Sequence, residues 1–188
     1  MSKRMSETCL SRRRFLMQSA VGAGGVMTTV LLGDLFGSSV LAADAAKPVR
    51  FARYPDRRVG SLTTLEVDRP VPFIYPNDDA QSVCTLVKLG VPAGGGVGPQ
   101  QDVVAFSSFC THQGGLLTGS YRAREKVMGP CPMHLSTFDL RRHGILTVGQ
   151  ATSALPQVVL EARGDDLYAI GVIGLMYGYA SNVPGGAS

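Results

Sequence analysis

Four residues of this sequence have the types and the spacing of a metal-binding site. Two cysteines and two of the three histidines fall in two short runs, Cys110-Thr111-His112 and Cys131-Pro132-Met133-His134, which gives the pattern C-x-H-x18-C-x-x-H. A structural zinc site more often takes a cysteine pair from one loop and a histidine pair from another. Two loops that each supply one thiolate and one imidazole favour a [2Fe–2S] cluster with two cysteines on one iron and two histidines on the other, and zinc stays the alternative.

The residues around both runs predict tight loops. The first run continues into Gln113-Gly114-Gly115, and the second is preceded by Gly129-Pro130. Glycines allow backbone amides to approach a sulfur closely, and prolines restrict the shape of a loop. The pattern therefore places all four candidate ligands in loops.

The segments CTHQGG and GPCPMHLSTFD resemble the paired motifs of Rieske iron–sulfur proteins. The resemblance implies that Cys110, His112, Cys131 and His134 bind the cluster and that Ser136 donates a hydrogen bond to a sulfur. In the Rieske proteins of cytochrome bc complexes, each loop has an extra cysteine and the two form a disulfide; this sequence has Gly115 and Met133 instead. A tyrosine that donates to a ligand sulfur is replaced by Phe138, so we expect a potential in the middle of the Rieske range of about −150 to +300 mV.

A finer resemblance is to the small subunit of arsenite oxidase. It rests on the segments GGVGPQQDVVAFSSFCTHQGG, GPCPMHLSTFDLRRHG, ATSALPQVVLEARGDDLYAIGV and GLMYGY. It implies a heteromer with a large molybdopterin subunit that oxidises arsenite to arsenate. Electrons would then pass through this subunit to a c-type cytochrome or a blue copper protein, and no residue of this chain would be catalytic. The resemblance also matches Leu155-Pro156 to a proline loop that covers the cluster.

Two other functions stay open at this point. One is the Rieske subunit of a quinol-oxidising cytochrome bc complex, and the other is a zinc-binding structural subunit. A Rieske oxygenase is excluded because its mononuclear iron needs two further histidines and a carboxylate. Only His143 remains, and we expect it in an exposed turn.

The first 43 residues have the pattern of an export signal. A basic start with Ser11-Arg12-Arg13-Arg14-Phe15-Leu16 matches the twin-arginine motif, and an apolar stretch over 15–42 ends in small residues. We therefore expect export to the periplasm in the folded state, with membrane contact only if the segment is retained. Outside residues 1–42, 13 basic and 12 acidic side chains nearly balance, so we expect no nucleic-acid partner.

Composition and patterning predict an all-β fold over residues 44–188. The chain has 23 glycines and 11 prolines, and its apolar runs are short, rich in Val, Thr, Tyr and Phe, and separated by turn residues. We expect an antiparallel Rieske fold with an inserted cluster-binding lobe near 108–142 and a hairpin around 163–166. Cys84 should be a buried strand residue, and the glycine-rich segment 94–98 a loop between strands. The predicted strands are 49–54, 62–67, 72–75, 82–89, 102–109, 145–148, 157–162 and 167–173.

Overall fold

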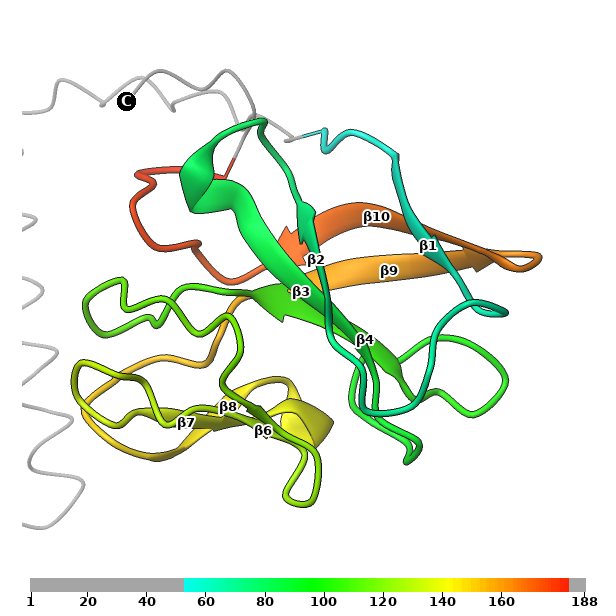
Figure 1. Ribbon diagram of the computed structural model, residues 1–188. Coiled ribbons are helices and arrows are strands. Elements are labelled where there is room, and N and C mark those ends of the chain that lie inside the picture. Colours follow the sequence, from blue (N-terminus) through cyan, green and yellow to red (C-terminus); the bar gives the residue numbers. More distant parts are fainter. Residues whose placement is uncertain (1–52, 183–188) are drawn as a thin grey trace, which may run out of the picture. The chain divides into compact units, whose positions relative to one another are not determined.

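The computed structural model describes residues 53–182, and in that range it holds strands, short 3-10 turns and loops but no α-helix (Figure 1). The all-β class is therefore confirmed. Within these residues no helix is long and apolar enough to cross a membrane. The expected export segment, 1–43, lies outside the described residues. The elements are β1 (Arg57–Ser61), β2 (Val71–Ile74), η2 (Ala80–Ser82), β3 (Val83–Lys88), β4 (Val103–Ser107), β5 (Tyr121–Arg122), β6 (Val127–Met128), β7 (Thr137–Asp139), η3 (Leu140–Arg142), β8 (Ile145–Val148), β9 (Gln157–Arg163) and β10 (Asp166–Ile173).

The larger sheet has six antiparallel strands in the order β1-β10-β9-β4-β3-β2. Its last two strands form the expected hairpin, in which Arg163 pairs with Asp166 across Gly164 and Asp165. A two-residue connection that starts with glycine is typical of such hairpins. The sheet therefore places β9 beside β4, the strand that leads into the first candidate ligand loop.

A smaller antiparallel sheet is inserted between β4 and β9, with the order β5-β6-β7-β8. Figure 1 shows its strands β6, β7 and β8 below the larger sheet. Three of its strands have only two or three residues. Such short strands bury little surface, so the loops and side chains around them must hold this sheet in place.

The central strands β3 and β4 separate two groups of core residues. In β4, Val104 and Phe106 pack with residues of the smaller sheet and the ligand loops, whereas Val103 and Ala105 pack with β9 and β10. Side chains alternate between the two faces of a strand, so a strand covered on both faces becomes apolar throughout. This explains why all five residues of β4 are buried.

Most strand predictions are confirmed to within two residues. The range 145–148 matches β8, and 72–75, 82–89, 102–109, 157–162 and 167–173 match β2, β3, β4, β9 and β10. The prediction of a strand at 62–67 is wrong, because the chain turns there after β1 and Thr64 bonds back to the carbonyl of Ser61. Of the range 49–54, residues 49–52 lie outside the described part, and Arg53 and Tyr54 have no regular structure.

Candidate functional site

The two candidate ligand loops share one backbone hydrogen-bond pattern. In each loop, the cysteine N–H donates to the carbonyl five residues later, and the N–H four residues later donates back to the cysteine carbonyl. That fourth residue has a positive φ in both loops, 69° at Gly114 and 63° at Leu135. The two loops therefore share one backbone hydrogen-bond pattern, although His112 follows its cysteine by two residues and His134 follows its cysteine by three. The bonds are Cys110 N to Gly115 O (2.9 Å), Gly114 N to Cys110 O (2.9 Å), Cys131 N to Ser136 O (2.8 Å) and Leu135 N to Cys131 O (2.9 Å).

The fold brings the four candidate side chains together in two pairs of like groups. The thiols of Cys110 and Cys131 lie in contact with each other, and these residues are 1% and 2% exposed. The rings of His112 and His134 meet edge to face, with centroids 4.6 Å apart. His134 is exposed and His112 is half-buried, so the thiol pair lies inside and the imidazole pair faces the surface.

These pairs suit a cluster of two irons, each of which takes two protein ligands. Within residues 53–182 no three Cys, His, Asp or Glu side chains converge as they would on one metal ion. His112 Nδ1 is buried and has no hydrogen-bond partner there. A buried ring nitrogen without a partner costs free energy unless it binds something, and a neutral imidazole nitrogen is a common metal ligand.

The raised pKa of the Cys110 thiol also fits a metal site. Burial raises the pKa of the Cys110 thiol, while hydrogen bonds from the His112 backbone and from the Ser136 hydroxyl act in the opposite direction. A buried thiol stays protonated unless a metal displaces its proton. Iron binding would supply the charge that makes the two buried thiolates stable.

The residues that replace the family's disulfide lie side by side. A Cβ atom on Gly115 would be 3.1 Å from Met133 Sδ and 2.5 Å from Cys131 Sγ. Contacts of 2.5 Å are not tolerated without a shift of the neighbouring atoms. The space between the loops is thus filled by the thioether of Met133, and a side chain at position 115 would press on a candidate ligand.

Ser136 is placed to donate to a sulfur. It is fully buried, and its hydroxyl oxygen accepts hydrogen bonds from the backbone N–H groups of Gln150 (3.1 Å) and Ala151 (3.2 Å). Both lone pairs of the oxygen are then used, so its single proton is available for the Cys110 sulfur. Phe138 is also fully buried and packs in the same core group as both cysteines, but it has no hydroxyl to donate.

Comparison with known proteins agrees with this geometry. Residues 81–159 match the family model of the Rieske [2Fe-2S] domain. The chain is 53% identical to iodate reductase subunit IdrB of Denitromonas iodatirespirans, over 94% of this chain and 89% of that protein. This chain belongs to the Rieske [2Fe–2S] family. Its cofactor is accordingly a [2Fe–2S] cluster, not a single zinc ion.

Two further comparisons agree with this assignment. Iodate reductase subunit IdrB of Pseudomonas sp. (strain SCT) is 47% identical over 92% of this chain and 84% of that protein. The soluble domain of the Rieske protein II (soxF) from Sulfolobus acidocaldarius has a TM-score of 0.58 at 22% identity, covering 68% of this chain and 82% of that chain. The second likeness shows that the fold is shared.

Two segments distant in sequence cover the first ligand loop of this Rieske protein. Thr111 Oγ1 donates to the carbonyl of Ser153 at 3.0 Å, so the loop before Pro156 is tied to the residue between two candidate ligands. Leu155 is 1% exposed and packs in the core group of both cysteines. That Leu155 and Pro156 cover the cluster stays a prediction of the resemblance. The ring of Tyr177 lies so close to Gly114 that a Cβ there would be 2.2 Å from it.

The contact with Tyr177 was not expected from the sequence, because the segment GLMYGY had no assigned role. Met176 anchors this segment in the core, and Asn182 closes it by bonding to Met176 N (2.9 Å) and to the carbonyl of Gly174 (2.6 Å). Met176 is therefore buried while Leu175 and Tyr177 on either side of it are exposed, which a short apolar run does not reveal.

The remaining candidates have structural roles. Cys84 is fully buried in β3, as expected. His143 does lie in an exposed turn, with φ 53° after η3, but its Nδ1 also bonds Gln157 Oε1 at 2.8 Å. Gln157 Nε2 donates to the carbonyl of Gly94 at 2.8 Å, so this contact ties the turn to β9 and to the glycine-rich loop between β3 and β4.

Proposed function

We propose that this protein is the electron-transfer subunit of an exported, heteromeric molybdopterin oxidoreductase. Cys110 and Cys131 would bind one iron of the cluster, and His112 and His134 the other. The pairing of buried thiols and outward imidazoles is the observation that carries this proposal. The cluster would supply one-electron redox chemistry, and this chain would hold it in place, shield its sulfurs and present one edge to a partner.

Iodate is the substrate that we assign to the large subunit. Two relatives that are named iodate reductase subunits match more than nine-tenths of this chain at 53% and 47% identity. The motif resemblance to arsenite oxidase covers a similar part of the chain without distinguishing the two substrates. We therefore propose iodate, rather than arsenite, as the substrate of the large subunit. Arsenite oxidation is the second candidate function.

The two candidates differ in the direction of electron flow. Reduction of iodate to iodide consumes six electrons and six protons and releases three waters, so electrons would pass from a periplasmic c-type cytochrome or blue copper protein through this subunit to molybdenum. Arsenite oxidation releases two electrons, which would pass the opposite way. In both cases the subunit has no substrate site of its own.

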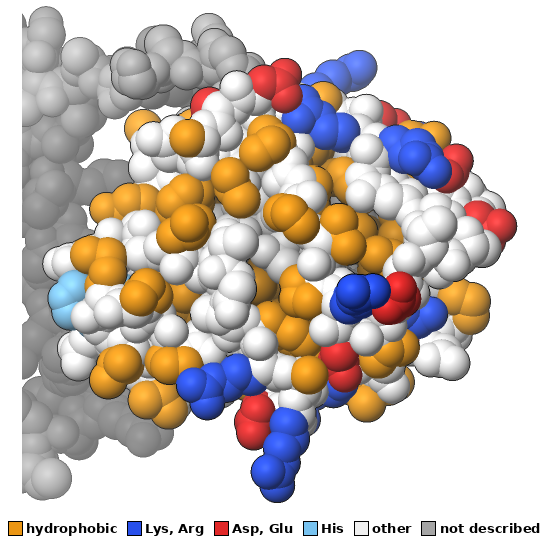
Figure 2. Space-filling view, viewed as in Figure 1, with side chains coloured by type: hydrophobic (Ala, Val, Ile, Leu, Met, Phe, Trp, Pro, Cys, Tyr) orange, Lys and Arg blue, Asp and Glu red, His pale blue; other side chains and the backbone are white. Residues whose placement is uncertain are grey.

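The surface at the imidazole pair suits a subunit interface. Residues 103–121, 127–138, 143–160 and 167–182 contain no Asp, Glu, Lys or Arg, and they include both ligand loops and the segments that cover them. In Figure 2 hydrophobic side chains predominate near the visible histidine, and charged ones lie mainly toward the opposite side and along the upper and lower edges. Exposed apolar side chains without charges are typical of stable interfaces. The exposed large apolar side chains in these ranges, at 41–63%, are Leu116, Met133, Leu135, Ile145, Val148, Ile173, Leu175 and Tyr177.

Purification of the native complex tests this function. A tag on this chain should co-purify a large molybdenum-containing subunit, and the reduced complex should give a Rieske EPR signal. The complex should reduce iodate with a chemically reduced electron donor, at a rate far above its rate of arsenite oxidation with an oxidised acceptor. The reverse ratio would support the arsenite candidate, and the absence of both a partner and a Rieske signal would refute the proposal. Detection of the mature chain in a periplasmic fraction, and its loss when Arg12 and Arg13 are both replaced with lysine, would test the export route.

A further inference from the structure

The first ligand loop has few restraints of its own. Residues 113–115 are Gln-Gly-Gly, and the two hydrogen bonds within the loop both join Cys110 to these glycines. Glycine loses more conformational freedom on folding than any other residue, so a glycine-rich loop is costly to fix. No cysteine of residues 53–182 forms a disulfide that could join this loop to the second one. Contacts from other segments must therefore keep the loop in one conformation.

One of these contacts is made by Tyr177, near the end of the described chain. A Cβ atom on Gly114 would lie 2.2, 2.7 and 2.8 Å from the Cε1, Cδ1 and Cζ atoms of its ring, and real Cβ atoms do not approach other atoms so closely. Gly114 also has a φ of 69°, which favours glycine. The ring therefore fills the space into which a side chain at position 114 would extend, directly against the backbone of the loop.

The closing segment, residues 174–182, holds Tyr177 in this position from outside the loop. Figure 1 shows the segment in red beside the green loop that follows β4. Met176 is buried in the core group of the larger sheet. Tyr179 packs against the same group, and its hydroxyl donates to the carboxylate of Asp79 and accepts from the hydroxyl of Ser82 (2.9 Å). The residues on both sides of Tyr177 are thus anchored to the larger sheet.

Together with a second contact, Tyr177 restrains the loop on both sides of His112. Thr111 Oγ1 donates to the carbonyl of Ser153 at 3.0 Å, and the ring of Tyr177 lies against Gly114. The backbone of His112 lies between these two points. Its Nδ1 is buried without a hydrogen-bond partner among the described residues. A ligand nitrogen must be placed accurately to bind a metal, so restraint on both sides of His112 serves that placement.

The contact uses the ring of Tyr177 and not its hydroxyl. That hydroxyl makes no hydrogen bond with another residue in the range 53–182, and the side chain is 41% exposed. An aromatic ring offers a large contact area with only two side-chain torsions, so it holds a neighbour at a low cost in entropy. A phenylalanine should therefore serve equally well at this position, and an alanine should not.

We propose that Tyr177 is a positioning residue for the cluster. Its ring holds Gly114, and with it the backbone that carries His112, in the conformation that binds iron. The end of the chain thereby restrains a ligand loop without a covalent bond, in a protein that has no disulfide between its two ligand loops. The role rests on the binding of iron by His112 that is part of the proposed function, and it holds for either substrate of the large subunit.

Iron release and EPR spectra of the purified, cluster-containing protein test this role. With an excess of an iron(II) chelator, reduced Tyr177→Ala should lose iron roughly tenfold faster than the wild type, and its Rieske EPR signal should broaden as His112 takes a range of positions. Tyr177→Phe should match the wild type in both measurements. Tyr168→Ala is the matched control, because it truncates a half-buried tyrosine of β10 whose ring packs against Arg163, and it should change neither measurement. Equal behaviour of Tyr177→Ala and Tyr168→Ala would overturn the proposal.

A double-mutant cycle tests whether the ring acts through Gly114. Gly114→Ala should speed iron release more in the wild type than in Tyr177→Ala, because the new Cβ meets the ring only in the wild type. The cost of the positive φ is common to both backgrounds and cancels in the comparison. Purely additive effects would overturn the proposal.

Two further measures keep the outcome decisive. If Tyr177→Ala assembles too little cluster to be measured, Tyr177→Leu takes its place in every comparison. A wild type without a Rieske EPR signal would refute the proposed ligands together with this role. A normal wild-type signal with unchanged iron release in Tyr177→Ala would refute this role alone.

Discussion

Replacement of Ser136 by alanine should lower the reduction potential of the cluster. The hydroxyl oxygen of Ser136 already accepts from the N–H groups of Gln150 and Ala151, so its proton is free to donate to a sulfur of the site. A sulfur becomes more negative when the cluster gains an electron, so a donor stabilises the reduced state more than the oxidised state. Removal of the donor therefore makes reduction less favourable.

The size of this shift follows from the strength of the bond. A hydrogen bond between neutral groups contributes about 0.5–1.5 kcal/mol, and one to a charged group about 1.5–3 kcal/mol. The Ser136 hydrogen bond should therefore be about 1–1.5 kcal/mol stronger in the reduced state than in the oxidised state. For a one-electron couple, 59 mV corresponds to a tenfold change, or about 1.4 kcal/mol, so the potential should fall by about 40–60 mV. The variant should also lose about 1–3 kcal/mol of stability, because the two N–H groups lose their acceptor.

A redox titration followed by EPR measures this shift directly. Ser108→Ala is the matched control, because Ser108 is equally buried and its hydroxyl bonds Thr85 Oγ1 at 2.8 Å instead of a cluster sulfur. That variant should lose stability without a change in potential. An unchanged potential in Ser136→Ala, with the EPR spectrum intact, would refute the assignment of Ser136 as a donor. Equal falls in both variants would show that loss of packing, and not of the hydrogen bond, lowers the potential.

Three other perturbations have definite expected outcomes. Phe138→Tyr should raise the potential by about 40–60 mV, measured by the same titration, at a packing cost of about 1–3 kcal/mol. Gly149→Ala should reduce cluster occupancy, measured as iron per protein, because the new Cβ would be 2.3 Å from the Ser136 backbone. Gly164→Ala is the control: this glycine also has a positive φ but lies in open space, so its replacement should leave the occupancy unchanged. Burial raises the pKa of Asp68, but hydrogen bonds from Lys126 and Tyr121 have the larger combined effect and hold this pKa below its usual value. The ionised Asp68 therefore stabilises the fold at neutral pH, and this stabilisation is lost as pH falls below about 4. Asp68→Asn should therefore cost about 1–2 kcal/mol at pH 7, less in acid, in denaturant unfolding at several pH values.

The central part of the fold could be predicted because its strands satisfy local rules. The strands β3 and β4 are apolar on both faces, and β9 and β10 flank a glycine-containing two-residue turn, so pattern and turn chemistry agree. The first strand was missed since its sequence, RRVGS, is polar at the sheet edge, where Arg58 pairs with Asp166 on the surface. Strands β5 to β7 were missed because two or three residues show no periodicity.

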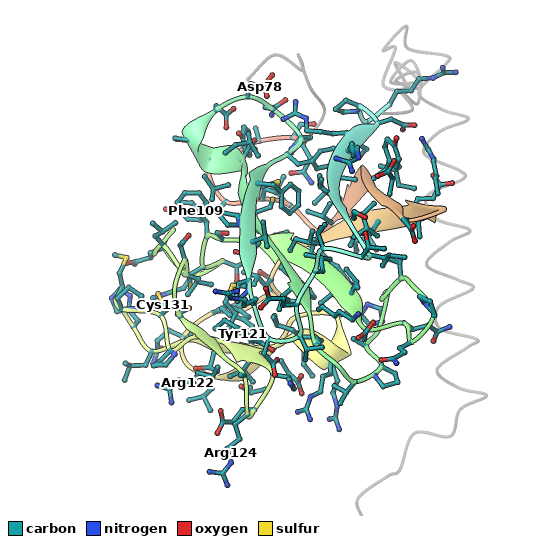
Figure 3. All side chains as sticks on the ribbon, turned by 45° about the vertical axis from the view of Figure 1, so that its right-hand side comes forward. Asp78, Phe109, Tyr121, Arg122, Arg124 and Cys131 are labelled. Carbon is teal, nitrogen blue, oxygen red and sulfur yellow. The ribbon has the colours of Figure 1, made fainter. Side chains whose placement is uncertain are left out.

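The ligand loops were predictable for a different reason. Metal ligation requires particular side chains at a fixed spacing, so Cys110, His112, Cys131 and His134 stand out in the sequence without any knowledge of the fold. The side chains that hold the small sheet do not stand out. Asp68, between β1 and β2, accepts hydrogen bonds from Tyr121 and Lys126 at the β5–β6 hairpin, and Figure 3 shows that Arg124 of this hairpin points away from the protein. Such contacts between distant segments depend on the tertiary structure alone.

The missing hydroxyl at Phe138 bears on the two steps of electron transfer. A relay with one fewer donor to its sulfurs has a lower potential, and the free energy of each transfer step changes by −nFΔE. A lower potential makes it easier for the relay to give electrons to a partner and harder for it to take them. In iodate reduction phenylalanine at this position therefore favours transfer from the cluster to molybdenum and opposes uptake from the cytochrome or copper protein. In arsenite oxidation it favours transfer to that soluble partner and opposes uptake from molybdenum. The potential of the relay thus determines which of the two steps is uphill, while the overall free energy is fixed by the substrate and the soluble partner.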